Sequence, residues 1–200
     1  KAMRKNGKAY NTISAMSKIL KPSFKMAMKN HLIRENPFDF RLNDVLTNDT
    51  VKREALTDEQ VAALLDFIAH DNTYSQHLDW FIVLLETGVR MSEFCGLTKA
   101  DLDFENRLIV INKQLLRRKD GSKYVKAPKS AAGNRVIAMS DEASNSLHNI
   151  LEHRKCRTVE PMIDGYCGFL MLTKGDKPVV ATGLGAIMRR VVDKYNREHS

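Results

Sequence analysis

Apolar residues near the start of the chain recur at intervals of three and four, the spacing of one face of an α-helix. That face consists of Ile13, Met16, Leu20, Phe24, Ala27 and Met28. Four lysines follow nearly the same spacing on the opposite face: Lys18, Lys21, Lys25 and Lys29. The pattern predicts an amphipathic helix, with a kink or a restart at Pro22 because proline lacks the N–H that a helix interior needs. Its lysine face either contacts a phosphate backbone or is simply solvated.

A change of composition divides the chain. Pro37 disfavours helical backbone at Asn36 and so ends the first helical run, and the stretch that follows is polar. Thr57, with Gln60 three residues later, forms a capping-box pattern that predicts a new helix. We therefore expect three segments: a helical domain over residues 1–40, a linker over 41–56 and a second domain over 57–200.

The second domain is predicted to be built around one helix at about residues 76–86, which is apolar on almost every side. Gly88 should end or turn that helix. A short helix from Val89 to about Gly96 should follow it.

Short apolar runs further along predict a three-stranded antiparallel sheet with strands at 108–111, 124–125 and 135–137. Asp120-Gly121 is a hairpin signal between them. Ser140 and Thr182 are candidate caps for two later helices. The expected fold class is mainly α-helical with a small antiparallel β-sheet, arranged as two domains.

Composition is that of a soluble protein, with 43% hydrophobic and 28% charged residues. No apolar run has the length of a membrane span, and no signal peptide is visible. The three cysteines are Cys95, Cys156 and Cys167. They lack the spacing of a zinc site, so we expect thiols in a reducing cytoplasm and no bound metal.

The charge is concentrated in two regions. Residues 1–53 hold twelve Lys/Arg and four Asp/Glu, which accounts for the whole net charge of +8. Within the neutral remainder, residues 113–135 hold eight Lys/Arg and one acid. Two separate basic regions favour a polyanionic partner such as nucleic acid, contacted at two places. The alternative is a pair of solvated basic faces.

Chemistry is suggested where the apolar helix ends. An Arg and a Glu, Arg90 and Glu93, follow Gly88 directly. Polar groups delivered by a buried element are costly unless they pair or serve a purpose. Taken alone, they could be an ordinary helix ion pair at three-residue spacing.

Three stretches in order resemble one family, the tyrosine recombinases of the phage integrase type. Thr87-Gly88-Val89-Arg90-Met91-Ser92-Glu93 resembles the family's TGxRxSE motif. Ala127-Pro128-Lys129-Ser130-Ala131-Ala132-Gly133-Asn134-Arg135 resembles the hairpin loop that carries its catalytic lysine, and His31–Phe38 resembles the end of its core-binding domain. The similarity spans about residues 10–195 and is greatest to integrases of conjugative transposons.

The resemblance implies a site-specific recombinase in which a tyrosine attacks DNA and forms a 3′-phosphotyrosine, without metal or nucleotide cofactor. Arg90 would stabilise charge on the phosphate oxygens, as a bidentate guanidinium can. Lys129 would protonate the leaving oxygen, with Lys123 and Lys126 as the other candidates. Glu93 would orient Arg90.

The implied partners are double-stranded DNA and other recombinase protomers, as a dimer or tetramer on DNA. Two domains would clamp the duplex, with no membrane involved. The expected DNA contacts are Lys18, Lys21, Lys25, Lys29, Lys113, Arg117, Arg118, Lys123, Lys126 and Arg135.

Several family elements are missing. After the Lys129 loop we find neither a His-x-x-Arg motif nor the tyrosine nucleophile, and Tyr195 lies too early in the family's order. We expect these elements beyond Ser200, so that residues 1–200 bind DNA without cleaving it. A non-catalytic DNA-binding protein with this fold is the alternative. A type IB topoisomerase is disfavoured by the resemblance to a core-binding domain.

Overall fold

The computed structural model describes residues 2–52, 54–128, 133–156 and 159–199. It divides into two compact units, Lys1–Ala55 and Leu56–Ser200, each of which is described by itself. Among the described residues, no helix is both long and apolar enough to cross a membrane.

The first unit is built on one long helix. Its elements are α1 (Ala2–Lys5), α2 (Tyr10–Lys29) and α3 (Leu42–Val45). Helix α2 continues through Pro22, so the proline does not restart it. The chain after α2 returns along it: the Phe38 ring lies 5.0 Å from that of Phe24, and the Asn36 amide donates to the Lys21 carbonyl oxygen at 3.2 Å.

Most of the predicted apolar face of α2 is uncovered. Only Ile13 is buried on this helix, while Met16, Leu20 and Met28 of the predicted face are 47%, 37% and 39% exposed. The amphipathic pattern therefore predicted the helix correctly, but the described chain supplies little that packs against it.

The second unit contains the remaining elements. Its helices are α4 (Asp58–His70), η1 (Ser75–His77), α5 (Leu78–Thr87), α6 (Met91–Gly96), η2 (Lys99–Asp101), α7 (Asp141–His153) and α8 (Ala181–His199). Its strands are β1 (Leu102–Asp103), β2 (Leu108–Ile111), β3 (Gln114–Arg117), β4 (Lys123–Lys126) and β5 (Arg135–Ala138). The mainly helical fold with small antiparallel sheets agrees with the predicted class.

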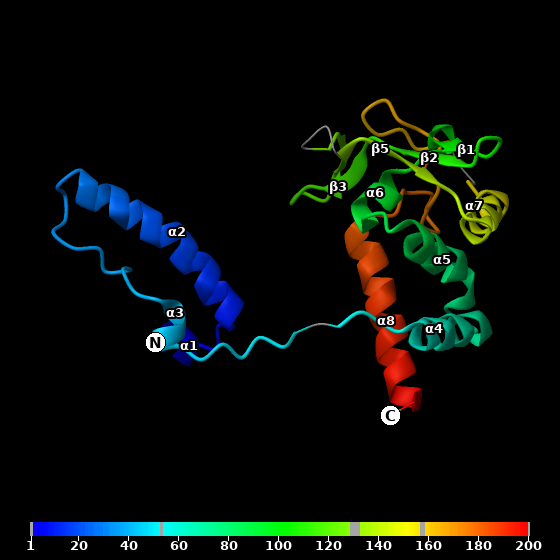
Figure 1. Cartoon of the computed structure of the whole chain (residues 1–200). Helices are drawn as coiled ribbons and strands as arrows, with labels where there is room; N and C mark the ends of the chain where they lie inside the picture. The colour runs from blue at the N-terminus through cyan, green and yellow to red at the C-terminus, as the bar shows by residue number, and fades with distance from the viewer. Residues whose placement is uncertain (1, 53, 129–132, 157–158, 200) are drawn as a thin grey trace. The chain divides into compact units, whose positions relative to one another are not determined.

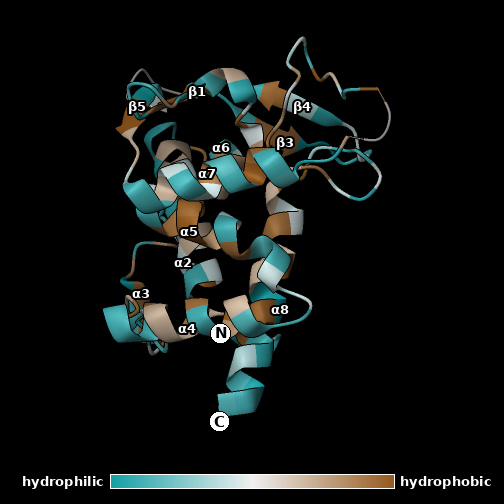
Figure 2. Cartoon of the chain, turned by 90° about the vertical axis from the view of Figure 1, so that its right-hand side faces the viewer, coloured by the Kyte–Doolittle hydropathy of each residue, from teal (hydrophilic) through white to brown (hydrophobic). Residues whose placement is uncertain are grey.

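Helix α5 is the centre of this unit. It contacts α4 on one side and α7 on another, as Figure 1 shows. Phe81 and Val83 on α5 are buried, and Phe94 of α6 is fully so. Figure 2 shows that α7 is largely hydrophilic on the side turned to the viewer, whereas β5 is largely apolar. The nearly all-apolar sequence of α5 is what a helix surrounded by protein requires.

The strand pairing differs from the prediction. Strands β1, β2 and β5 form one antiparallel sheet in that order, and β3 and β4 form a separate hairpin. The Asp120-Gly121 turn explains the difference. It closes between Arg118 N and Ser122 O at 2.8 Å, so β4 pairs with β3, the residues just before the turn, and not with β2 or β5.

One of the two predicted helix caps is confirmed and the other is wrong. The Ser140 hydroxyl accepts from Ala143 N at 3.1 Å and caps α7 as expected. Thr182 is not the cap of α8, because that helix begins at Ala181. The N–H groups of Gly183 and Leu184, in the first turn of α8, donate to the Val180 carbonyl oxygen.

Candidate active site

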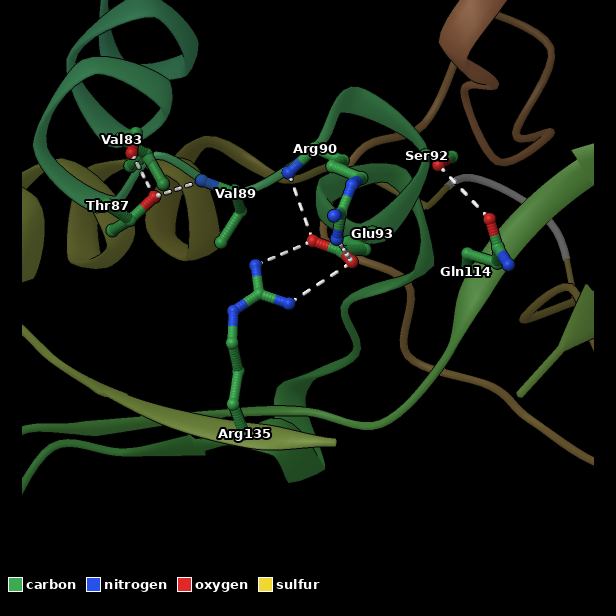
Figure 3. A network of polar contacts seen from close by, with 8 residues as sticks. All are labelled: Val83, Thr87, Val89, Arg90, Ser92, Glu93, Gln114 and Arg135. Atoms are coloured by element: carbon green, nitrogen blue, oxygen red, sulfur yellow. Dashed lines mark hydrogen bonds and ion pairs between the residues drawn. The ribbon is translucent and has the colours of Figure 1, made fainter. Parts of the chain in front are cut away.

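The turn between α5 and α6 is set by glycine and threonine. Gly88 has φ of +60°, a left-handed conformation that glycine adopts without strain. Its N–H bonds to Leu84 O at 3.1 Å and closes the last turn of α5. The Thr87 hydroxyl donates to Val83 O at 2.5 Å and accepts from Val89 N at 3.5 Å (Figure 3). Because this turn is short and tied on both sides, it holds the residues that follow in one direction.

Arg90 lies immediately after this turn, at the start of α6. Its backbone N–H donates to Glu93 Oε2 at 3.0 Å, and its Nη1 donates to Glu93 Oε1 at 2.8 Å. The Arg90 side chain is 73% exposed, whereas that of Glu93 is 6% exposed. The buried Glu93 carboxylate thus holds the Arg90 backbone and one nitrogen of a guanidinium whose side chain is otherwise exposed.

Arg135 reaches the same carboxylate from a different element. It is the first residue of β5, and its Nη2 and Nη1 donate to Glu93 Oε2 and Oε1 at 2.8 and 3.2 Å. Figure 3 shows the two arginines approaching Glu93 from opposite sides. The sequence predicts a DNA contact at Arg135, whereas the structure pairs its guanidinium with Glu93. The sequence does contain a signal for this contact: Glu93 stands in an otherwise apolar segment, and a buried carboxylate needs cationic partners.

These contacts determine the ionisation of Glu93. Burial by itself would raise its pKa, but hydrogen bonds from Arg135 and from the backbone and side chain of Arg90 outweigh burial and lower the pKa to about 2. The pKa of Arg135 is raised in turn, mainly by its hydrogen bonds to Glu93. Glu93 is therefore an anion at neutral pH, which suits an orienting role better than proton transfer.

The close fit of α6 against the hairpin fixes this arrangement further. A Cβ on Gly96 would lie 2.9 Å from the Gln114 Cα and the Leu115 nitrogen, so only glycine allows α6 to lie so near β3. The Ser92 hydroxyl also donates to Gln114 Oε1 at 3.3 Å. Helix α6 is therefore held by β3 as well as by Arg135 of β5.

The three lysine candidates are placed differently. Lys129 lies outside the described residues. Lys123 is half-buried and donates to the Pro178 carbonyl oxygen at 2.6 Å, and its pKa is lowered by burial and by the nearby Lys177 and Arg117. Lys126, at the end of β4, is exposed.

The remaining basic residues of the hairpin are mostly on the surface. Arg117 and Arg118 are exposed, and the Arg118 guanidinium lies 4.4 Å from the centre of the Tyr124 ring. In the first unit, Lys18, Lys25 and Lys29 are exposed, while Lys21 pairs with Asp39 at 3.1 Å.

Lys113 requires a correction. It was expected to contact DNA, but its ammonium is buried and paired with the buried Asp101. Thr98 donates to the same carboxylate through its N–H and its hydroxyl, both at 2.7 Å, and the Tyr166 ring lies 5.0 Å from the ammonium. We therefore remove Lys113 from the set of proposed DNA contacts.

Within the parts of the chain that the structure describes, no three His, Cys, Asp or Glu side chains are grouped so as to hold a metal ion. Cys95 lies in α6, the helix that follows Arg90, but burial raises the pKa of its thiol to about 12. It remains protonated and serves as part of the core.

Comparison with known proteins identifies the class. Residues 54–200 match the model described as the phage integrase family. This match covers more than half of the chain, so the protein belongs to that family, the tyrosine recombinases.

Two relatives indicate how much of such proteins this chain represents. The transposase from transposon Tn916 of Enterococcus faecalis is 45% identical over 196 residues, 98% of this chain and 48% of the relative. The integrase of Staphylococcus phage L54a is 27% identical over 78% of this chain and 46% of its own length. The chain thus spans about half the length of the curated relatives it matches.

Solved structures agree with the fold. The integrase of transposon Tn1549, in complex with a circular intermediate DNA, superposes with a TM-score of 0.91 at 40% identity, over 98% of this chain and 62% of that one. The XerA recombinase, at 18% identity and a TM-score of 0.50 over 72% of this chain and 44% of that one, shares the fold alone.

The ionisation of Glu93 predicts an acid dependence of stability. Its folded-state pKa of about 2 lies below the ordinary value of 4.5, so its contribution is present above pH 4.5 and is lost as pH falls towards 2. The shift corresponds to about 3 kcal/mol. In urea unfolding between pH 6 and 2, Glu93→Gln should lose less stability on acidification than the wild type. Glu105→Gln, which removes an exposed carboxylate, is the control, and identical pH profiles for wild type and Glu93→Gln would contradict the assignment.

The burial of Lys113 predicts a structural defect when it is removed. Lys113→Ala leaves the Asp101 carboxylate buried without its cation and should cost about 3–5 kcal/mol. Urea unfolding, followed through the single tryptophan, Trp80, measures this. The double variant Lys113→Met/Asp101→Asn removes both charges and keeps an amide oxygen that accepts from Thr98, so it should recover much of the loss. A loss below about 1 kcal/mol in Lys113→Ala would show that the pair is not buried in solution.

Proposed function

We propose that this chain is the DNA-binding and phosphate-clamping part of a site-specific recombinase, the integrase of a conjugative transposon. The parent enzyme would cleave and rejoin DNA through a 3′-phosphotyrosine. The observation that carries the proposal is the exposed Arg90 guanidinium held on a buried, ionised Glu93. The similarity to the Tn916 transposase and to the DNA-bound Tn1549 integrase supports it.

Arg90 is assigned the scissile phosphate. Within the described chain, Glu93 is the only hydrogen-bond partner of its guanidinium, through Nη1, so the other N–H donors point to solvent. Attack on a phosphodiester gathers negative charge on the non-bridging oxygens, and a fixed guanidinium binds those oxygens more strongly as the charge develops. Since the arginine is already oriented, little reorganisation is needed when DNA binds.

Lys129 is assigned the leaving 5′ oxygen, to which it would deliver a proton. The resemblance of residues 127–135 to the family's lysine loop supports this assignment, because Lys129 itself lies outside the described residues. The Lys123 ammonium already donates to the Pro178 carbonyl, and Lys126 belongs to the exposed end of β4. Both remain suited to phosphate contact.

For DNA binding we propose two basic surfaces. The first is the lysine face of α2, in a core-binding domain assigned to residues 1–40 and joined by a linker, residues 41–56, to the catalytic domain, residues 57–200. The second is the β3–β4 hairpin. The two domains would close around the duplex as a clamp. The contacts retained are Lys18, Lys21, Lys25, Lys29, Arg117, Arg118, Lys123 and Lys126; phosphate contacts of this kind give affinity without reading sequence.

The active form would be a cytoplasmic assembly of recombinase protomers on double-stranded DNA, needing neither metal nor nucleotide cofactor. Tyr195 is not proposed as the nucleophile. Its ring stacks on that of His199 at 4.2 Å and packs edge-on to Phe67 at 5.4 Å, which supports a structural role. A non-catalytic DNA-binding protein is the second candidate, because no His-x-x-Arg follows Arg90 in this sequence.

Residues 1–200 alone should therefore bind DNA without forming a covalent complex. The measurement is incubation with a nicked suicide substrate followed by denaturing electrophoresis. A longer product of the same gene that carries a His-x-x-Arg and a tyrosine should form the covalent band, and this longer product is the positive control. Covalent DNA on residues 1–200 would contradict the assignment of the nucleophile. A longer product that has these residues but forms no covalent band would favour the non-catalytic candidate.

The hairpin should account for part of the salt dependence of binding. Arg117→Ala/Arg118→Ala removes two phosphate contacts and should reduce the slope of log K against log salt by up to about 2. Arg107→Ala/Lys155→Ala is the matched control, since it removes two exposed cations near α7 and should leave the slope unchanged. Fluorescence anisotropy between 50 and 300 mM salt measures both. Equal slopes in the wild type and the hairpin variant would remove the hairpin from the interface.

A further inference from the structure

Arg135 is committed to Glu93 more fully than a DNA contact would be. Both of its Nη atoms donate to the Glu93 carboxylate, and its side chain is 30% exposed, against 73% for Arg90. An arginine that donates through both Nη atoms to a buried carboxylate has few N–H groups available for a phosphate. This geometry separates Arg135 from the exposed arginines of the hairpin.

The carboxylate of Glu93 is filled to capacity. A carboxylate has about four acceptor sites, and four N–H groups occupy them: the Arg90 N–H and Nη1, and the two Nη atoms of Arg135. If Arg135 were absent, two sites of a buried anion would be open. The Arg90 guanidinium already bonds to this carboxylate through Nη1 and carries further N–H groups that can fill them.

Filling those sites would turn Arg90 inward. A guanidinium that pairs with a carboxylate through two prongs lies flat against it, so its outward donors would be withdrawn from solvent. With Arg135 in place, the Arg90 guanidinium bonds to Glu93 through Nη1 alone, and its other N–H groups remain available to a ligand. Arg135 therefore controls how much of Arg90 can face a phosphate.

We propose that Arg135 is a positioning residue that acts through Glu93 to keep the Arg90 guanidinium turned outward, and that it is not a DNA contact. This inference rests on the proposed function only in taking the anion bound by Arg90 to be a DNA phosphate. The arrangement of Arg90, Glu93 and Arg135 is independent of that assignment.

The position of Arg135 in the chain gives it a second link. It is the first residue of β5, and it pairs with the buried Ile111 in the register of the sheet. The ion pair between Arg135 and Glu93 thus joins the start of β5 to α6.

The first test needs no DNA. In 15N NMR of the wild-type chain, with Arg90 assigned from Arg90→Lys, the rate of rotation about the Nε–Cζ bond of Arg90 is the reference value for a guanidinium held by one hydrogen bond. Arg135→Gln should slow that rotation by at least about tenfold, because the guanidinium becomes held by two prongs. Arg135→Lys returns the charge without the fork and should give an intermediate rate. The control, Arg107→Gln, removes an arginine paired with the exposed Asp141 and should change nothing.

The second test is a double-mutant cycle on DNA affinity. Arg135→Gln should weaken binding of duplex DNA by about tenfold when Glu93 is present. In a Glu93→Gln background the same change should alter affinity by less than about twofold, because the group through which it acts is already neutral.

The outcomes are separable. A loss from Arg135→Gln that persists in the Glu93→Gln background would identify Arg135 as a direct DNA contact and overturn the proposal, as would unchanged rotation of Arg90. Absence of DNA binding by the wild-type chain would count against the proposed function instead, and the rotation measurement would still decide the role of Arg135. Circular dichroism checks folding; if Arg135→Gln does not fold, Arg135→Lys and Glu93→Gln complete both tests.

Discussion

The second unit depends on one buried anion. Glu93 receives hydrogen bonds from two arginines that come from different elements, one preceding α6 and one beginning β5. Burying a charge is costly, and removing either partner would leave it uncompensated. Four hydrogen bonds offset that cost here. The same contacts leave one guanidinium exposed and one enclosed, so a single ion-pair cluster both joins α6 to the sheet and presents a cation to solvent.

The elements around this cluster restrict its movement. The apolar helix α5 is enclosed by its neighbours, and the left-handed Gly88 ends it abruptly. Gly96 then permits α6 to lie against the backbone of β3. Groups carried on packed elements are held more accurately than groups on loops. Arg90 is consequently oriented before any ligand arrives, which is what stabilisation of a developing charge requires.

Basic residues in this chain serve two purposes that composition does not distinguish. Lys113 and Arg135 neutralise buried carboxylates, at Asp101 and Glu93. Arg117, Arg118 and Lys126 are exposed on the hairpin. All five lie in the same basic stretch of sequence. A count of charge locates a basic region correctly, but only burial shows which cations are available to a partner.

The sequence alone determined the longer helices, the glycine-terminated α5, the hairpin turn and the pair formed by Arg90 and Glu93, because each depends on neighbours within a few residues. Family membership also followed from such local motifs. The tertiary structure decided the strand pairing, the burial of Lys113 and the arrival of Arg135 at Glu93, which is 42 residues away in sequence. Contacts at that separation depend on how strands and helices pack together. Local spacing carries no information about them, since a lysine or arginine looks the same whether its partner is a buried carboxylate or solvent.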